Sequence, residues 1–255
     1  DQNELAMEVM KKLAVKHGLV CLLHEKPFEG VNGSGKHNNW SIATNDGQNL
    51  LNPGSTPMEN LQFLTFLCAV IKGVDEYADL LRISASSAGN DHRLGANEAP
   101  PAIISIFMGE ELQGVLDALE AGTSYKSESK VFEIGVDALP DFPKDSTDRN
   151  RTSPFAFTGN RFEFRMVGSS ENIACPNHML NTIVASELSD IADKMEKVPA
   201  DQFKDELKKL LAEIVKEHKR VIFNGDGYSD AWVEEAAKRG LPNYKTTADC
   251  VPHYA

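Results

Sequence analysis

The apolar positions at the start of the chain repeat with the period of a helix. Leu5, Val9 and Leu13 recur four residues apart, and Gly18 follows them. This spacing predicts an amphipathic helix that ends at the glycine, because a residue without a Cβ suits the left-handed position after a helix. The continuous apolar run at 19–23 predicts a strand.

Four later stretches predict further helices. Residues 56–59, Thr-Pro-Met-Glu, have the form of a capping box that opens a long apolar-rich helix through Leu81. A second helix is expected at 109–121. Apolar positions at helical spacing in 180–191 and 203–215 predict two more, and the polar face of the last one is a solvated run of Asp, Glu and Lys.

A strand-like stretch, Arg161-Phe162-Glu163-Phe164-Arg165, carries the first sign of chemistry. Alternation along a strand places the two phenylalanines in a core and the three charged side chains on the opposite face. A carboxylate between two guanidiniums can line a pocket for an anion and a cation. The alternative is a solvated sheet face with two surface ion pairs, which contribute little to stability.

A glycine-rich segment lies upstream, at residues 32–41, Asn-Gly-Ser-Gly-Lys-His-Asn-Asn-Trp-Ser. Its glycines let backbone N–H groups approach a ligand closely, and the neutral imidazole of His37 can bind a metal. It is not a P-loop, because no Gly-Lys-Ser/Thr stands at the required spacing. The alternative is an ordinary turn that contains a histidine.

These segments occur in a recognisable order. Asn-Gly-Ser-Gly-Lys-His is followed by Asn-Glu-Ala-Pro at 97–100, by Asn-Arg-Thr-Ser-Pro at 150–154 and then by the strand at 161–165. This order resembles the catalytic half of glutamine synthetase. The residues at 92–101 and at 217–225 are similar to those of the type III branch of that family.

The resemblance implies a fold and a division of the chain. The implied fold class is α+β, with a curved, mainly antiparallel β-sheet backed by helices, of the type shared by glutamine synthetase and guanidino kinase catalytic domains. Residues 1–180 are then part of the catalytic domain, and 181–255 form a helical C-terminal portion. The sheet alone would not identify the reaction.

The resemblance also implies an activity. Enzymes of the family ligate ammonia to glutamate, with ATP as co-substrate and Mg²⁺ or Mn²⁺ as cofactor, through a γ-glutamyl phosphate. Their active sites form between neighbouring subunits, so a homo-oligomeric ring, by resemblance a dodecamer, is expected.

Particular residues match the family's motifs, and the resemblance gives them roles. The implied metal ligands are His37 and Glu163. The implied glutamate-binding residues are Asn32, Gly33, Arg93, Glu98 and Arg165. The implied ATP-binding residues are Asn39, Ser41, Arg151 and Arg161. Glu98 and Arg151 are the implied catalytic residues: Glu98 shields the acyl phosphate and takes a proton from ammonium, and Arg151 meets the transferred phosphoryl group.

The chain departs from the better-known branches in several places. The gap between Arg93 and Glu98 is one residue shorter. Ala156 stands where those branches have a second phosphate-binding arginine, for which Arg149 is a candidate substitute, and Thr158 stands where they have a nucleotide-contacting lysine.

Charge and cysteine content limit the expected binding partners and cellular location. With 26 basic and 38 acidic residues the net charge is −12, which argues against a nucleic acid or an anionic membrane as partner. No run is long and apolar enough to span a bilayer. The 4 cysteines lack paired spacing, so we expect reduced thiols and a cytoplasmic location.

Two alternatives to glutamine synthesis stay open. The chain could ligate a larger amine to the glutamyl carboxylate, or it could be a non-catalytic member that serves a structural or regulatory assembly. The family's other metal-binding glutamates and its ammonia-activating aspartate would lie upstream of Asp1. We therefore expect residues 1–255 alone to be inactive or nearly so.

Overall fold

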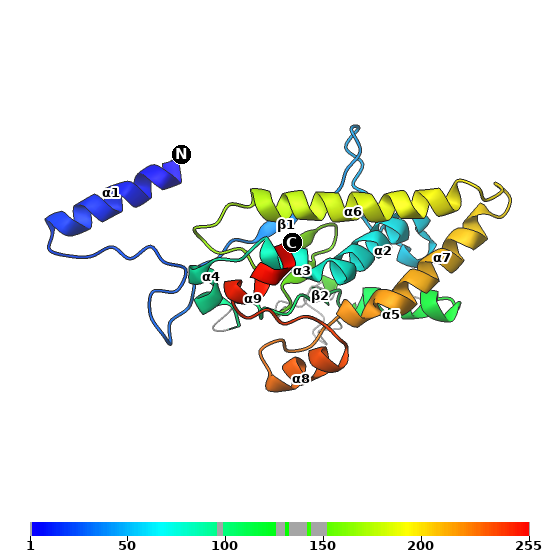
Figure 1. Cartoon of the computed structure of the whole chain (residues 1–255). Helices are drawn as coiled ribbons and strands as arrows, with labels where there is room; N and C mark the ends of the chain where they lie inside the picture. The colour runs from blue at the N-terminus through cyan, green and yellow to red at the C-terminus, as the bar shows by residue number, and fades with distance from the viewer. Residues whose placement is uncertain (1, 96–98, 126–130, 133–141, 144–151, 255) are drawn as a thin grey trace.

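The computed structural model describes residues 2–95, 99–125, 131–132, 142–143 and 152–254 (Figure 1). Its α-helices are α1 (Gln2–Lys16), α2 (Leu61–Glu76), α3 (Ala78–Ile83), α4 (Ala88–Arg93), α5 (Glu110–Ala121), α6 (Ala174–Met195), α7 (Phe203–His218), α8 (Asp230–Lys238) and α9 (Thr247–Cys250). Its strands are β1 (Asn38–Trp40), β2 (Ile106–Phe107), β3 (Val131–Phe132), β4 (Phe142–Pro143), β5 (Phe155–Phe157) and β6 (Phe162–Phe164).

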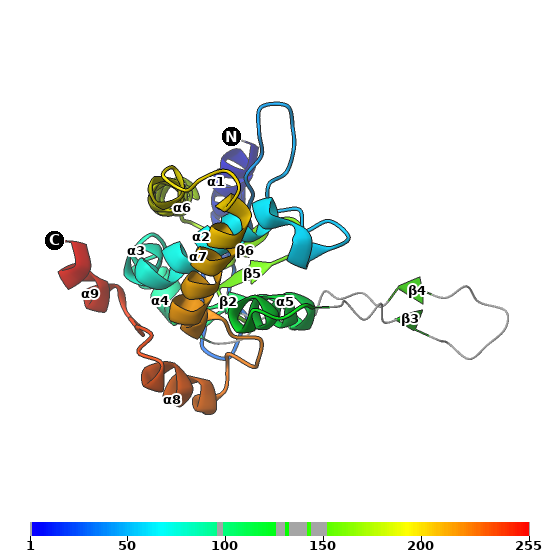
Figure 2. The ribbon, with the colours of Figure 1, turned by 90° about the vertical axis from the view of Figure 1, so that its right-hand side faces the viewer.

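Four short strands form the central sheet in the order β1-β6-β5-β2. The β1/β6 and β5/β6 pairs are antiparallel, and β2 pairs with β5 in parallel. Strands β3 and β4 pair separately, away from this sheet (Figure 2). The predicted α+β class with a mainly antiparallel sheet backed by helices is confirmed.

The alternation predicted for β6 is confirmed by its burial. Phe162 and Phe164 are fully buried, whereas Glu163 between them is partly exposed. The rings of Phe155 and Phe162 stack with centroids 4.7 Å apart, and Phe63 of α2 lies 6.1 Å from Phe157. The apolar face of the sheet therefore packs on α2, and the opposite face carries Glu163.

Helix α2 lies between α6 and α7 in a helical layer (Figures 1 and 2). It is apolar on nearly every side, which is typical of a helix surrounded by protein. Leu64, Leu67 and Ile71 of α2 are fully buried, as are Leu211 and Val215 of α7. The helices predicted from the apolar spacing at 180–191 and 203–215 are confirmed as α6 and α7.

The predicted capping box before α2 is wrong. Residues 57–59 form a 3₁₀ turn, and the Thr56 side chain makes no capping hydrogen bond. Instead, the Asn60 side chain accepts a hydrogen bond from Phe63 N at 3.0 Å and caps α2. Asparagine is among the strongest capping residues, so the helix begins after it. The helix also ends earlier than predicted, at Glu76, and the separate helix α3 follows from Ala78 to Ile83.

Charged groups are buried between the helices of this layer. Lys72 of α2 contacts Glu187 of α6, whose side chain is 1% exposed, and lies 3.4 Å from Asp190 Oδ2. His218 Nδ1 lies 2.9 Å from Asp75 Oδ2. These contacts fix how α2 lies against α6 and α7.

The first helix differs from this layer. The predicted helix and its stop are confirmed, since α1 ends shortly before Gly18, which has φ 69°. No residue of α1 is buried. The strand predicted at 19–23 is wrong: the segment forms neither a strand nor a helix, and Leu19 is 65% and Val20 81% exposed. It lacks a neighbouring strand in the described part of the chain to receive its backbone hydrogen bonds.

The helix predicted at 109–121 is confirmed as α5, with Gly109 (φ 80°) before it and Gly122 (φ 65°) after it. Within the described ranges, no helix is long and apolar enough to cross a membrane.

Candidate functional site

The pairing of β1 with β6 continues beyond both strands and brings the glycine-rich turn into place. Gly35 and Gly168 form an antiparallel bridge. Lys36 N donates to Val167 O at 2.9 Å, and Ser169 N donates to Ser34 O at 3.2 Å. The turn at 33–37 therefore lies beside the segment that follows β6, although more than a hundred residues separate the two in sequence.

This pairing brings the two predicted metal ligands together. His37 Nδ1 lies 3.5 Å from Glu163 Oε1, with side chains that are 56% and 17% exposed. Asn39 stands opposite Glu163 in the strand register, so its side chain lies on the same face. An imidazole, a carboxylate and an amide thus share one polar patch of the sheet.

His37 and Glu163 could together supply two of the ligands of a divalent cation. Ligands of an octahedral ion at about 2.1 Å lie about 3 Å apart when they are neighbours, close to the distance between these two atoms. Mg²⁺ usually keeps several waters and takes its remaining ligands from substrate phosphates. Among the described residues, no group of three or more His, Cys, Asp or Glu side chains could hold a metal. His37 and Glu163 can therefore supply part of a coordination shell.

Arg93, predicted to bind glutamate, lies at the end of α4 under the glycine-rich turn and is only 4% exposed. Its Nη2 donates to Arg165 O at 3.1 Å, and its Nη1 lies within hydrogen-bond distance of Asn90 Oδ1, Met166 O and Val167 O. The guanidinium thus holds the chain segment after β6. Burial lowers the pKa of Arg93, and the charge of Arg165 contributes to the shift.

Two glycines of the turn are required by this arginine. A Cβ on Gly33 would lie 2.7 Å from Arg93 Cγ, and a Cβ on Gly35 would overlap the guanidinium. The Asn-Gly-Ser-Gly segment therefore has a structural reason for its glycines, namely the close approach of Arg93.

Those predicted glutamate-binding residues that the structure describes gather at this end of the sheet. Arg165 is two positions beyond Glu163, and its backbone N donates to Pro154 O at 2.8 Å, so it continues the same edge. Arg165, Gly33 and Arg93 lie together, and exposed Asn32 precedes the turn.

Two of the predicted ATP-binding residues, Ser41 and Arg161, lie at the other end of the sheet, where a tight turn joins β5 to β6. Ser41 Oγ lies 3.2 Å from Asn160 O, which places Ser41 beside the turn that contains Arg161. Arg161 is exposed there. Thr158, which replaces the family's lysine, closes the turn by donating from its backbone N to Arg161 O at 2.8 Å.

Ala156, which replaces the family's second phosphate-binding arginine, stands opposite Glu163 in the register of β5 and β6. It is fully buried. The substitution therefore falls directly beside the predicted metal ligand and leaves no cation at that position.

Three of the predicted residues, Glu98, Arg151 and the substitute candidate Arg149, lie outside the described residues.

Sequence reasoning overlooked Lys36, whose Nζ donates to Ser169 O at 2.7 Å and also contacts Glu171 O. A lysine beside the glycines was the available signal, but its partners are more than a hundred residues away.

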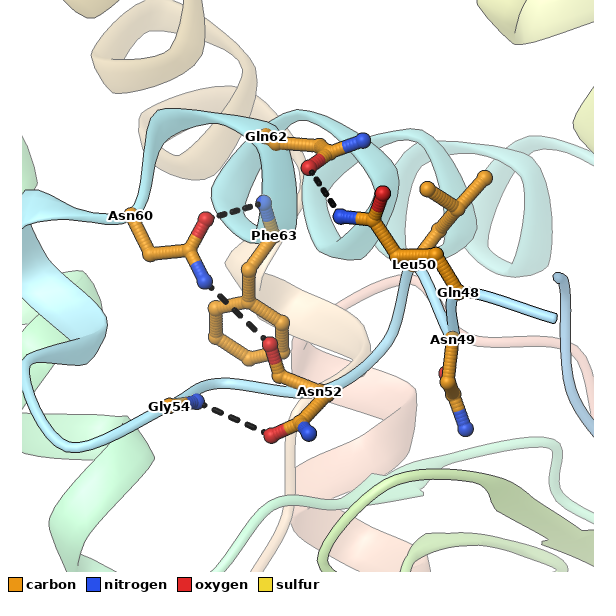
Figure 3. A pocket seen from close by; sticks show the side chains of 8 residues that line it. All are labelled: Gln48, Asn49, Leu50, Asn52, Gly54, Asn60, Gln62 and Phe63. Carbon is orange, nitrogen blue, oxygen red and sulfur yellow. Dashed lines mark hydrogen bonds between the residues drawn. The ribbon is translucent and has the colours of Figure 1, made fainter. Parts of the chain in front are cut away.

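A pocket beside the predicted ATP end was also overlooked. It has a volume of about 360 Å³ and is lined by Gln48, Asn49, Leu50, Asn52, Gly54, Asn60, Gln62 and Phe63 (Figure 3). Asn49 also lies 3.2 Å from Ser41 Oγ and donates to Asn160 O at 2.9 Å, which connects the pocket with the strand turn. The frequent amides of 48–62 were the signal in the sequence. Such a neutral lining can hydrogen-bond an uncharged polar group.

Comparison with known proteins gives the chain its relatives. The family model described as "Glutamine synthetase, catalytic domain" matches residues 1–105, and that described as "Glutamine synthetase C-terminal domain" matches residues 206–255. A "Glutamine synthetase" of Butyrivibrio fibrisolvens is 57% identical, over 100% of this chain and 36% of that protein. A "Type-3 glutamine synthetase" of Dictyostelium discoideum is 52% identical, over 98% of this chain and 34% of that protein.

A third relative, a "Glutamine synthetase" of Bacteroides fragilis (strain YCH46), is 47% identical over 100% of this chain and 36% of that protein. The chain thus spans about a third of the length of these relatives. The two family models and the full-chain identity agree with the motifs on the sheet: this chain belongs to the glutamine synthetase family.

Proposed function

We propose that this chain carries part of the active site of a glutamate–ammonia ligase, which forms glutamine from glutamate, ammonia and ATP. The observation that supports the proposal is the order of the site residues along the paired strands. Ser41 and Arg161, both predicted to bind ATP, lie at the β5–β6 turn, and the predicted metal ligands His37 and Glu163 lie in the middle beside Asn39. Gly33, Arg93 and Arg165, predicted to bind glutamate, lie at the glycine-rich turn. This spatial order suits phosphoryl transfer, in which the cation lies between the donor, ATP, and the acceptor, glutamate.

Each end of the strand pair has a task in the reaction. Ser41 and Arg161 hold the nucleotide, while Arg165 and the backbone of Gly33 orient glutamate, whose carboxylate suits a planar guanidinium. His37 and Glu163 hold the cation. When bound, Mg²⁺ or Mn²⁺ supplies positive charge that offsets the negative charge of the transferred phosphoryl group.

The chemistry proceeds in two steps. An oxygen of the glutamate side-chain carboxylate attacks the γ-phosphorus of ATP, and the bond from that phosphorus to ADP breaks. Ammonia then attacks the acyl carbon of γ-glutamyl phosphate, and phosphate leaves with the bonding electrons. Glu98 takes the proton that the nitrogen loses and Arg151 meets the phosphoryl oxygens, both by resemblance to the family motifs.

The setting of the reaction is part of the proposal. Residues 1–180 belong to the catalytic domain and 181–255 to its helical C-terminal portion. The assembly is a homo-oligomeric ring, a dodecamer by family resemblance, and the location is cytoplasmic.

The test is ADP release by the product of the full reading frame that encodes this chain, with Mg²⁺ and ATP. Glutamate and ammonia are supplied together, separately, and with a larger amine in place of ammonia. A Glu163→Ala variant is compared with Glu29→Ala, a substitution of an exposed acid that has no role in this proposal.

We expect release that needs both glutamate and ammonia, falls by at least about a hundredfold in Glu163→Ala and is unchanged in Glu29→Ala. Release that needs the larger amine would reassign the second substrate. A lack of release from a well-assembled oligomer would favour a non-catalytic member of the family.

A further inference from the structure

Glu25 is a buried acid on an otherwise exposed segment, and no role described above uses it. It is 4% exposed, whereas Leu22 before it is 42% exposed and Phe28 after it is 62% exposed. Burial of a carboxylate is costly unless partners replace its water. The segment therefore buries an acid and exposes apolar residues, which is the reverse of the usual pattern and requires an explanation.

Its partners come from the loop that follows β6. Glu25 Oε1 accepts a hydrogen bond from Ser170 N at 3.1 Å and also contacts Ser170 Oγ. Two glycines make room for the carboxylate: a Cβ on Gly89 would overlap Oε2, and one on Gly168 would lie 3.0 Å from Glu25 Cγ. The acid thus connects its own segment with the start of α4 and with the loop after β6.

Glu25 also meets the glycine-rich turn. Its backbone O accepts from Ser34 N at 2.6 Å. A Cβ on Gly33 would lie 3.0 Å from that same oxygen and 2.7 Å from Arg93 Cγ. Glu25 and Arg93 therefore pack against the same turn.

The charge of Glu25 acts on Arg93 as well. Glu171 and Glu25 both favour the protonated form of the buried guanidinium, against burial and the charge of Arg165, which lower the pKa of Arg93. Within the described residues, the Arg93 guanidinium donates to neutral oxygens of Asn90 and of the backbone at 165–167. Acids at longer range therefore supply the negative charge that balances it in the described structure.

We propose that Glu25 is a positioning residue for glutamate: its carboxylate fixes the turn at 32–35 and Arg93 in the arrangement that receives the amino acid. It acts through these groups and does not touch the substrate. The inference rests on the proposed ligase function and adds a residue that sets the affinity for one substrate.

The experiment is steady-state kinetics of Glu25→Gln in the product of the full reading frame. Glu29→Gln, on the same segment but exposed, is the matched control. We expect KM for glutamate to rise about tenfold while KM for ATP and kcat stay within about twofold, because a displaced binding group affects the substrate it receives. Ser170→Ala, which removes one donor to Glu25, should raise KM for glutamate by a smaller factor.

If Glu25 had only a structural role, Glu25→Gln would change kcat and both KM values together or lower the amount of folded protein. An unchanged or lowered KM for glutamate in Glu25→Gln would overturn the proposal, since a lowered value would mean that the acid only weakens the attraction for an anion.

Hydrogen exchange of residues 1–255 separates this inference from the proposed function. Amides at 32–37 should exchange at least about tenfold faster in Glu25→Gln than in Glu29→Gln, because the turn loses its anchor. Equal exchange in the two variants would contradict the inference whether or not the protein releases ADP. If wild-type protein lacks glutamate-dependent ADP release, the proposed function fails and this arm still decides whether Glu25 anchors the turn.

Discussion

Helices α1 and α7 have similar lengths and both follow the helical period, yet they have opposite fates in the structure. Helix α7 buries Leu207, Leu211, Ile214 and Val215 against α2 and α5. Helix α1 buries none of its residues and lies away from the rest of the chain (Figure 1). An amphipathic pattern thus predicts a helix but does not identify the surface that covers its apolar face.

The difference has an energetic consequence. Most of the stability of a helix in a protein comes from packing of its apolar face. Helix α7 should therefore unfold together with the core, whereas α1 should contribute little to the cooperative transition of residues 1–255. Matched substitutions in the two helices test this contrast.

The largest expected effect comes from truncation of an apolar side chain in the core. Leu211→Ala should lower the free energy of unfolding by about 2–5 kcal/mol, because it removes a fully buried side chain and leaves a cavity. Leu13→Ala, on α1 with 46% exposure, should change it by less than about 0.5 kcal/mol. Urea unfolding of both variants measures the difference. Equal losses would show that α1 packs on the core in solution.

A smaller effect is expected from the ion pairs of the two regions. Lys72→Met leaves Glu187 buried without its cation and should cost about 1–3 kcal/mol. The cost is limited because burial already raises the pKa of Glu187, so that it can take up a proton. Lys12→Met removes an exposed contact of 3.2 Å to Glu8 and should leave the urea midpoint unchanged. If Lys72→Met left the free energy of unfolding unchanged, this result would contradict a stabilising role for the buried pair.

The smallest expected effect is the pH dependence of the stability that the Lys72–Glu187 pair contributes. Burial opposes the charge of Lys72, but the surrounding acids, Glu187 above all, together outweigh it and raise the pKa of Lys72 above the ordinary value of 10.5. The folded state then binds the proton more tightly than the unfolded state, so the contribution is complete below pH 10.5 and is lost as the pH rises through the folded pKa. The urea midpoints of wild type and Lys72→Met should converge as the pH rises above 10.5. A constant difference would contradict the coupling.

Local patterns predicted the elements that depend on neighbouring residues. The burial of Phe162 and Phe164 followed from alternation, and α6 and α7 followed from apolar positions at helical spacing. The start of α2 did not follow, because the cap was predicted at Thr56, whereas the side chain of Asn60 caps the helix.

The site was predictable only in part, for a similar reason. Motif resemblance pointed to His37 and Glu163, which the β1/β6 pairing brings within 3.5 Å. It did not predict that Arg93 would donate to backbone carbonyls, or that Glu25 would be buried. Both depend on contacts between segments that are far apart in sequence, which no local pattern encodes.

The central claim is that His37 and Glu163 hold a divalent cation midway along the paired strands. The most direct measurement is Mn²⁺ titration of ¹⁵N-labelled protein, read as paramagnetic broadening of backbone amides. The account predicts selective broadening at 37–40 and 162–164 that is lost in Glu163→Gln and retained in Glu187→Gln. Glu187 and Asp190, which lie around Lys72 in the helical layer, form the comparison cluster. Broadening that is centred on that cluster, or that persists unchanged in Glu163→Gln, would contradict it.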